Sequence, residues 1–284
     1  MSHVPPIDLD HVHAYQVEKL QFRYPGHDGS RAGRTVLEEV SFAVRTGEML
    51  GIIGPNGAGK STLLRCLAGI ARPTGGHVNL FGSGLHGISR QDSARLIAYV
   101  PQDLTTPFAF SVRDVVLMGR FPHRSAHRWG LPGWDRSEDY DRAAQALSDL
   151  ELIDLADRLL DELSAGERQR AYLARALAQE SRILLLDEPT AFLDLHHQLE
   201  ICRILRRIRR DKQLTIVMVS HDLNLAGQYC DRLLLLAGGR AVGPERPVSV
   251  LQATTLTAAY GCPVLVDIHP ETGHPRIGLP GPGQ

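Results

Sequence analysis

The sequence has no hydrophobic run long enough to cross a membrane. Its longest apolar stretches, such as LLLLA at 233–237, fall far short of the roughly 20 residues that a spanning helix needs. The opening residues MSHVPPIDLDHVHAY also lack the basic segment and apolar core of a signal peptide, so we expect no export by that route. Any membrane role of this chain would therefore require a partner protein.

Cysteine is scarce and charge is nearly balanced. The cysteines are widely spaced without a CxxC pair, which argues against a zinc knuckle or a disulfide framework and favours reduced core thiols in a cytosolic protein. A formal net charge of −1 over 284 residues argues against long-range attraction to nucleic acid or acidic membranes as the main role. The four cysteines are Cys66, Cys202, Cys230 and Cys262.

What is present is an alternation of strand and helix patterns. Residues 15–24 and 36–44 alternate apolar and polar side chains, which predicts an antiparallel pair joined by a glycine-rich loop. The apolar run at 49–54 predicts a strand buried on both faces, and a helical pattern follows it. The same alternation returns in RILLLDEP, LTIVMVS and DRLLLLA with helical segments between them. The predicted fold class is α/β, with a mainly parallel sheet core and an antiparallel β subdomain.

The organisation along the chain follows from these patterns. We expect a loose tail over 1–13, one main domain over 14–243 and a short C-terminal extension over 244–284 that could form a small hairpin. The three histidines of the tail lack the converging ligands of a metal site, so no metal is expected there. Residues about 104–180 look like an inserted helical subdomain. No sustained heptad occurs in it, which excludes a long coiled coil.

GPNGAGKST at 54–62 matches the pattern G-x-x-x-x-G-K-[ST] and lies between a predicted strand and a predicted helix. Glycines allow backbone N–H groups to surround phosphate oxygens, and the N-terminus of the helix adds partial positive charge. Lys60 would bind the β and γ phosphates, and Ser61 would offer its hydroxyl to Mg²⁺. The candidate phosphate-binding residues are Gly54, Pro55, Asn56, Gly57, Ala58, Gly59, Lys60, Ser61 and Thr62.

Two adjacent carboxylates end the hydrophobic strand ILLLDE. A strand-end aspartate is often only a cap or a turn former, but beside a phosphate loop it is expected to hold Mg²⁺. Asp187 is therefore the metal candidate. Glu188 is the candidate that orients or deprotonates the water attacking the γ-phosphate, which predicts ATP hydrolysis rather than binding alone.

Five further short segments complete a pattern in a fixed order. They are FRYPG with Tyr24, YVPQD with Gln102, LSAGE with Ser164 and Gly166, AFLD with Asp194, and VSHD with His221. Each is weak alone, because a strand tyrosine is usually a core residue and a lone histidine is usually structural. Their order and spacing are specific, and from Tyr15 to Gly243 the chain resembles the ATP-binding cassette (ABC) ATPases, a class of P-loop NTPases.

The resemblance assigns roles to these residues. It implies that Tyr24 stacks on adenine, that Gln102 senses Mg²⁺ and couples to a partner, and that His221 is the switch histidine at the γ-phosphate. Asp194 matches the aspartate of the D-loop. Lys60, Gln102, Glu188 and His221 are thus the catalytic candidates, and Ser61, Gln102 and Asp187 the metal candidates.

The segment LSAGE departs from the family's LSGGQ at two positions. Ser164 and Glu167 form the pattern of a capping box, which ordinary helices also carry. A capped helix N-terminus with little side-chain bulk is also an anion site, and in this family it faces the nucleotide of the other subunit. Ala165 falls at the first helical position, where alanine is tolerated, and Gly166 is retained. The resemblance therefore implies a head-to-tail dimer around two ATP molecules.

Features that the sequence lacks reduce the number of ABC ATPase classes that it resembles. Zinc modules, coiled coils, a second cassette and fused membrane helices are missing, so the chain looks like the ATPase subunit of a bacterial importer. The segment VxxGRxPH at 116–123 and the ending HPxTGxP resemble those of ATPases serving siderophore, haem and vitamin B12 uptake. The former lies where such a cassette receives the permease helix.

The importer resemblance also implies partners and a location. Two transmembrane permease subunits and, indirectly, a periplasmic or lipid-anchored substrate-binding protein are expected. The chain would be peripheral at the cytoplasmic face of the inner (plasma) membrane. The cargo itself is not encoded in a cassette.

The alternative is a soluble ABC ATPase that acts on nucleic acid or ribosomes. Its one supporting feature is a basic face formed by Arg203, Arg206, Arg207, Arg209 and Arg210. The opposite face carries Leu195, Leu199, Cys202, Leu205 and Ile208, which is typical of the solvated side of an amphipathic helix. We therefore expect no nucleic-acid partner.

Overall fold

The computed structural model describes residues 13–25, 33–103, 108–124, 137–278 and 280–281. The chain divides into two compact units. The first contains the chain up to Ile88 and again from Thr215, and the second contains Ser89–Leu214. The expected helical subdomain at about 104–180 lies within the second unit. The extension at 244–284 belongs to the first unit.

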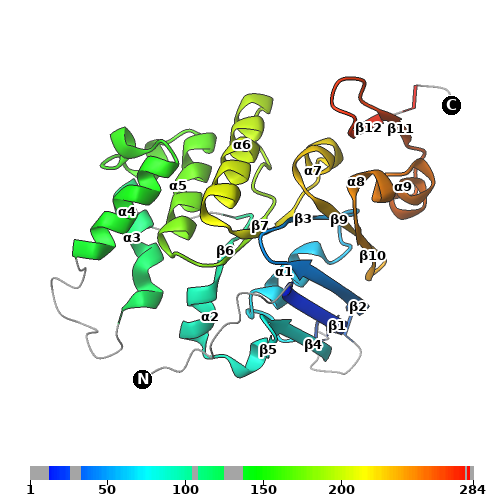
Figure 1. Ribbon diagram of the computed structural model, residues 1–284, viewed down its shortest axis with the longest axis horizontal. Coiled ribbons are helices and arrows are strands. Elements are labelled where there is room, and N and C mark those ends of the chain that lie inside the picture. The colour runs from blue at the N-terminus through cyan, green and yellow to red at the C-terminus, as the bar shows by residue number, and fades with distance from the viewer. Residues whose placement is uncertain (1–12, 26–32, 104–107, 125–136, 279, 282–284) are drawn as a thin grey trace. The chain divides into compact units, whose positions relative to one another are not determined.

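The first unit carries an antiparallel sheet and part of a parallel one (Figure 1). Its elements are β1 (His13–Arg23), β2 (Thr35–Arg45), β3 (Met49–Ile53), α1 (Lys60–Leu67), β4 (Gly75–Leu80), β5 (Ser83–Gly84), η1 (Leu85–Gly87), β8 (Thr215–Val219), α7 (Leu223–Tyr229), β9 (Arg232–Ala237), β10 (Arg240–Glu245), α8 (Pro247–Val250), α9 (Ala253–Tyr260), β11 (Leu265–Ile268) and β12 (Pro275–Gly278).

The antiparallel sheet has the order β2-β1-β4-β5. β1 and β2 pair antiparallel as their alternating patterns predict, with Val17 opposite Phe42 and Phe22 opposite Leu37. The inward-facing side chains of both strands are buried, which explains the alternation in the sequence. The loop between them includes residues 26–32, which lie outside the described part of the chain.

The parallel strands of this unit surround β3. All five residues of β3 are buried, and the strand pairs in parallel with β8 on one side and β9 on the other. A strand with neighbours on both sides and cover on both faces needs a continuous apolar run, and MLGII supplies it. β10 pairs antiparallel with β9. The predicted parallel core is thus confirmed.

The C-terminal segment ends in the predicted hairpin. β11 and β12 pair antiparallel, with Val266 opposite Ile277. Asn224 of α7 holds this hairpin from the side: its amide oxygen accepts the N–H of Ile277 at 2.8 Å, and its amide nitrogen donates to the carbonyl of Ile277 at 3.3 Å.

The second unit is mainly helical, with one pair of parallel strands (Figure 1). Its elements are α2 (Arg90–Leu96), β6 (Ile97–Val100), α3 (Val112–Leu117), η2 (Met118–His123), α4 (Ser137–Asp149), η4 (Ile153–Leu155), η5 (Leu160–Glu162), α5 (Ala165–Ala178), β7 (Ile183–Asp187) and α6 (Leu195–Lys212). α3 and α4 pack on α5, whose inner face is lined by small and aromatic side chains. Within the described residues, no helix is both long enough and apolar enough to cross a bilayer.

Three details of the sequence predictions change. Within the predicted helical subdomain, residues 112–123 do not form one continuous helix: α3 ends at Leu117, and the tighter 3₁₀ segment η2, which contains Pro122, follows it. Cys66, Cys202 and Cys230 are buried as expected, but Cys262 is exposed because it follows the end of α9 at Gly261. Leu195, assigned to the apolar face of α6, is 68% exposed at the first turn of that helix.

Candidate functional site

The glycine loop at 54–62 connects the buried strand β3 to α1. Gly54 and Gly59 have φ values of 145° and 100°, which only glycine adopts without strain. A side chain at Gly54 would begin 2.0 Å from the carbonyl oxygen of Leu236, and one at Gly59 would begin 2.8 Å from Val36. The two glycines therefore allow the loop to turn sharply against β9 and β2.

Lys60 lies inside this loop. Its ammonium group donates to the carbonyl oxygens of Gly54 at 2.8 Å and Pro55 at 2.9 Å, and the residue is only 6% exposed. Lys60 is also the first residue of α1, where the peptide N–H groups of the first turn point away from the helix. The loop thus combines a fixed ammonium with a helix N-terminus, the features that bind phosphate groups.

Tyr24 lies beside the same loop. Its hydroxyl oxygen is 3.2 Å from the hydroxyl oxygen of Thr62, and its ring packs edge-on against Phe22 with the ring centres 5.0 Å apart. The residue remains 42% exposed. A cleft of about 1170 Å³, lined also by Arg23 and Arg240, opens at this ring. An exposed aromatic face next to a phosphate loop is suited to stacking on a nucleobase.

His221 follows β8 on the same edge of the sheet. β3 and β8 run parallel with Ile52 opposite Val219, and Ser220 donates its N–H to the carbonyl of Ile52 at 3.1 Å. Asp222 caps α7 by accepting the N–H of Leu225 at 2.9 Å. The exposed imidazole is therefore held between a buried strand and a capped helix. The ends of two adjacent strands thus carry the glycine loop and His221.

The acidic pair and the glutamine meet in the second unit. β6 and β7 run parallel with Val100 opposite Leu186, so the residues that follow them share one edge. The amide nitrogen of Gln102 donates to a carboxylate oxygen of Glu188 at 2.8 Å. Asp187 is 3% exposed and accepts a long hydrogen bond of 3.4 Å from the hydroxyl of Tyr99. The structure thus brings two of the candidate residues, Gln102 and Glu188, into direct contact.

The segment Leu163–Glu167 begins α5 as the capping pattern predicts. The hydroxyl of Ser164 accepts the N–H of Glu167 at 3.3 Å, and the carboxylate of Glu167 accepts the N–H of Ser164 at 2.9 Å. Ala165 is the first helical residue. Hydrogen bonds from Ser164, first from its side chain and then from its backbone, lower the pKa of Glu167 below its ordinary value.

Gly166 and Asp194 are linked by a residue that the sequence did not reveal. A side chain at Gly166 would begin 2.3 Å from the imidazole of His197, so this ring covers the glycine. Asp194 caps α6, and its carboxylate accepts from both the backbone N–H and the ring Nδ1 of His197 at 2.9 Å. These two bonds, the backbone one first, lower the pKa of Asp194. Only its position three residues after a helix-capping aspartate could have indicated His197.

The structure therefore assembles the predicted residues in groups. In the first unit, Tyr24, the loop at 54–62 and His221 lie around the ends of β3 and β8. In the second unit, Gln102 contacts Glu188, and His197 joins Gly166 to Asp194. Among the described residues, no cluster of three or more His, Cys, Asp or Glu side chains could hold a metal ion, and His3 and His11 lie outside that part of the chain.

Comparisons with known proteins identify relatives of this chain. A family profile described as "ABC transporter" matches residues 37–191. The chain is 44% identical over 252 residues to a hemin import ATP-binding protein of Pseudomonas fluorescens, covering 87% of this chain and 95% of that protein. It is 43% identical over 250 residues to a cobalamin import ATP-binding protein of Halobacterium salinarum, covering 87% of this chain. The match spans only 61% of that longer relative.

A solved structure extends the likeness to the fold. A metal-chelate type ABC transporter in an inward-facing conformation superposes with a TM-score of 0.79 and 32% identity, covering 94% of this chain and 97% of that chain. The residues 37–191 that the family profile matches include the glycine loop with its buried lysine, the paired Gln102 and Glu188, and the capped α5. From this agreement of residues, fold and relatives it follows that the chain belongs to the ABC transporter family, as an ATP-binding cassette.

Proposed function

We propose that this chain is the ATP-hydrolysing subunit of a bacterial importer for an iron complex (siderophore or haem) or vitamin B12. The observation that carries the proposal is the position of Lys60. Its ammonium is fixed at the carbonyls of Gly54 and Pro55 inside a loop of left-handed glycines. An ammonium held in this way at a helix N-terminus binds the terminal phosphates of ATP.

The groups proposed for hydrolysis are Glu188 of the second unit and His221 of the first. Glu188 would orient the attacking water and accept its proton, and the contact with Gln102 fixes the direction of its carboxylate. His221 would donate to an oxygen of the γ-phosphate. Mg²⁺, bound with ATP, would neutralise charge on the β and γ phosphates. The hydroxyl of Ser61, the amide oxygen of Gln102 and the carboxylate of Asp187 are the hard oxygen donors that Mg²⁺ prefers, so they fit this ion.

A second copy of the chain would complete each site, in a head-to-tail ATP sandwich dimer. Ser164 and Gly166 sit at the N-terminus of a capped 14-residue helix, which suits the γ-phosphate of ATP held by the other copy. Two large apolar side chains beside Asp194 remain in solvent: Phe192 is 91% exposed and Leu195 is 68% exposed. Exposed apolar residues next to a half-site favour burial against that second copy.

Cargo, partners and location follow from the relatives by analogy. The similar proteins are named for the import of hemin and cobalamin, and the similar structure is that of a metal-chelate type transporter. By analogy, two permease subunits would span the membrane, and a periplasmic or lipid-anchored binding protein would deliver the cargo. The chain itself would lie at the cytoplasmic face of the inner membrane.

The contacts of α6 weaken the alternative of a nucleic-acid ATPase. Arg207 pairs with Glu151, Lys212 with Asp149, and Arg210 with its neighbour Asp211. These carboxylates neutralise part of the basic face that would have to meet phosphate groups. We therefore keep the importer as the one proposed function.

The test is the behaviour of Glu188→Gln in purified protein. Wild type should release phosphate from ATP, whereas the variant should bind ATP but turn over about 10²- to 10⁴-fold more slowly, because the proton acceptor is lost. With ATP, the variant should sediment as a dimer. The double variant Glu188→Gln with Lys60→Ala is the matched control and should stay monomeric. Hydrolysis by Glu188→Gln at the wild-type rate would refute the assigned role.

A companion experiment separates the importer from the soluble alternative. The chain is purified from detergent-solubilised membranes of cells that express it at its natural level. Co-purification of membrane-spanning subunits is expected. Complete recovery in the soluble fraction, without any membrane partner, would favour the alternative.

A further inference from the structure

Helix α5 is held at both ends, and only its N-terminal end is explained by the proposed function. That end carries Ser164 and Gly166. The other end, at Ala178 and the two residues after it, is gripped by the segment η2. We call Gly119, Arg120 and His123 the clasp, because all three contact the last turn of α5 or the residues that follow it.

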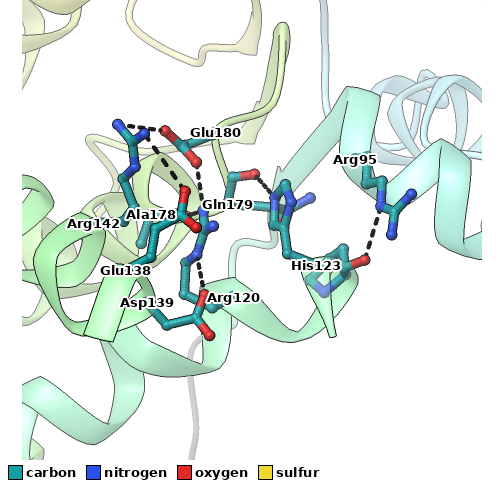
Figure 2. Close-up of polar contacts among 10 residues, drawn as sticks. Arg95, Arg120, His123, Glu138, Asp139, Arg142, Ala178, Gln179 and Glu180 are labelled. Atoms are coloured by element: carbon teal, nitrogen blue, oxygen red, sulfur yellow. Dashed lines mark hydrogen bonds and ion pairs between the residues drawn. The ribbon is translucent and has the colours of Figure 1, made fainter. Parts of the chain in front are cut away.

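Arg120 is the centre of the clasp. Its side chain is 4% exposed, and its guanidinium spans three partners: Nε donates to Asp139 at 2.9 Å, and NH1 donates to the carbonyl of Ala178 and to the carboxylate of Glu180, both at 2.7 Å (Figure 2). Arg142 also pairs with Glu180 at 3.1 Å. The planar fork of an arginine can satisfy several acceptors at fixed angles, which the single ammonium of lysine cannot do.

Gly119 and His123 complete the grip from either side of Arg120. A side chain at Gly119 would begin 2.1 Å from the carbonyl oxygen of Arg175, so the backbone of η2 lies directly against α5. His123 Nε2 is 2.8 Å from the carbonyl oxygen of Gln179, and because a carbonyl can only accept, the imidazole donates (Figure 2). The carbonyl groups of Arg175, Ala178 and Gln179, at the end of α5, are thus contacted by one short segment.

The clasp is itself anchored from α2. The side chain of Arg95 donates to the carbonyl of Pro122 at 3.0 Å (Figure 2). Gln91 donates to the carbonyls of Pro122 and Arg124. Gln179, the residue after α5, donates to the carbonyl of Ile97 at 2.8 Å. The end of α5 is therefore tied to a frame that includes the start of β6, the strand that leads to Gln102.

We propose that Arg120 and His123 are positioning residues for ATP hydrolysis, which set the orientation of α5 and thereby place Ser164 and Gly166 against the nucleotide of the second copy. The inference rests on the proposed function. It assigns to the GRFPH segment an internal task, since Arg120 is buried and therefore cannot meet a permease directly. Phe121, 54% exposed on the same turn, is the most exposed residue of the segment, and Pro122 and His123 are half-buried.

Because α5 is long, a small rotation at the clasp displaces its N-terminal end. Fourteen residues at about 1.5 Å each make a rod of about 21 Å. A tilt of about 3° at the clasp therefore moves the N-terminal end by about 1 Å. A misplacement of about 1 Å in a positioning group can lower a rate by about 100-fold. Small changes in the clasp should thus appear as defects in the half-site, without any change in the glycine loop of the first unit.

The experiment uses the full chain in the Glu188→Gln background, where ATP drives dimer formation. Arg120→Lys keeps the charge opposite Asp139 but removes the multi-point fork. His123→Leu removes the donor to Gln179, and His123→Gln restores an N–H donor. Arg113→Lys is the control, because it changes an exposed arginine–aspartate pair of the same unit, 2.8 Å from Asp157. Binding of ATP to the monomer and ATP-driven dimerisation are measured separately for every variant.

We expect Arg120→Lys and His123→Leu to weaken dimerisation by about 10- to 100-fold, with monomer binding of ATP within twofold of the parent. His123→Gln and Arg113→Lys should match the parent. Unchanged dimerisation in both clasp variants overturns the inference. A parallel loss of ATP binding by the monomer also overturns the inference, because it would mean that the clasp serves only folding. A His123→Gln variant that dimerises as poorly as His123→Leu overturns it as well. If Arg120→Lys does not fold, the inference is tested by comparing the dimerisation of His123→Leu with that of His123→Gln.

Failure of the proposed function has a different signature. In that case the parent Glu188→Gln protein would form no ATP-driven dimer, and the inference would fall with it. A parent that dimerises with ATP, beside clasp variants that dimerise equally well, refutes the clasp alone.

Discussion

Gly166 has no room for a side chain, because the ring of His197 covers it at 2.3 Å from where a Cβ would lie. The same ring is held by Asp194, so the glycine of the half-site and the aspartate of the D-loop share one imidazole. Under the proposed function, any substitution at Gly166 would therefore act in two ways, by blocking the nucleotide of the second copy and by displacing His197. A loss of activity in Gly166→Asp would not distinguish these effects.

A double-variant cycle separates obstruction of the nucleotide from displacement of His197. Gly166→Ala should destabilise the protein by about 1–3 kcal/mol, because the new methyl group overpacks against the ring. In Gly166→Ala with His197→Ala, the clash is removed and most of that loss should be recovered, as measured by urea unfolding. ATP turnover of the double variant then reports the half-site alone. If the two substitutions destabilise the protein additively, the His197 contact does not limit Gly166.

Tyr24 offers a second test at the scale of one side chain. Tyr24→Ala should raise KM for ATP and for GTP alike, by the equivalent of about 1–3 kcal/mol, because the ring stacks on any base. Tyr24→Phe keeps the ring and loses only the contact with Thr62, so its KM should stay near the wild-type value. Steady-state kinetics with ATP and with GTP measures KM for the wild type and both variants. An unchanged KM in Tyr24→Ala would contradict the stacking role.

Single residues show what sequence patterns can and cannot predict. The capping box of Ser164 and Glu167 was predictable, because both partners lie within one turn. Arg120 was assigned to a surface segment that meets a permease, yet it is buried, since its partners Asp139 and Glu180 lie 19 and 60 residues away. His197 was missed for the same reason: its contact with Gly166 joins two helices distant in sequence.

At the scale of elements, the N-terminus of α5 is both stabilised by its capping box and proposed to bind ATP. Glu167 accepts two hydrogen bonds from Ser164 and lies at the positive end of the helix, and both effects favour its ionised form. The pKa of Glu167 in the folded protein is therefore lower than the ordinary value of 4.5. As the pH falls, Glu167 is protonated in the unfolded chain before it is protonated in the folded protein. Its carboxylate therefore stabilises the fold above pH 4.5, and this contribution is lost as the pH falls through the folded pKa.

Glu167→Gln tests this account of α5. The glutamine can still form the capping box but carries no charge, so at pH 7 the variant should be less stable than wild type by about 0.3–1 kcal/mol. The difference should vanish as the pH falls from 4.5 through the folded pKa of Glu167. Urea unfolding at several pH values measures it. Glu18→Gln, an exposed change on β1, is the matched control. A difference that persists at low pH would contradict the electrostatic explanation.

Most elements were predictable because their signals are local. β3, β7, β8 and β9 follow from continuous apolar runs, and α6 from its apolar stripe. The division of 111–123 into α3 and η2 was not predictable from periodicity. There the packing of Gly119 on the backbone of α5 determines the path of the chain, and this tertiary contact overrides the helical pattern.

At the scale of the whole molecule, each of the two compact units carries its own set of candidate groups. The first holds Tyr24, the glycine loop and His221, and the second holds Gln102, Glu188 and the N-terminus of α5. The order of motifs along the chain was sufficient to predict this content, since each motif is short and tied to a strand end or a helix start. The cargo has no such signal, because no motif in the sequence indicates it.

The most direct test of the central claim is uptake by cells of the source organism. The natural copy of the gene is replaced by one encoding Glu188→Gln, and uptake of radiolabelled ferric siderophore, haem and cobalamin is measured beside wild type. We expect uptake of one of the three to fall to background in the variant strain and to return when the wild-type chain is supplied. Unchanged uptake of all three, with the variant chain present at wild-type level, would contradict the proposed function.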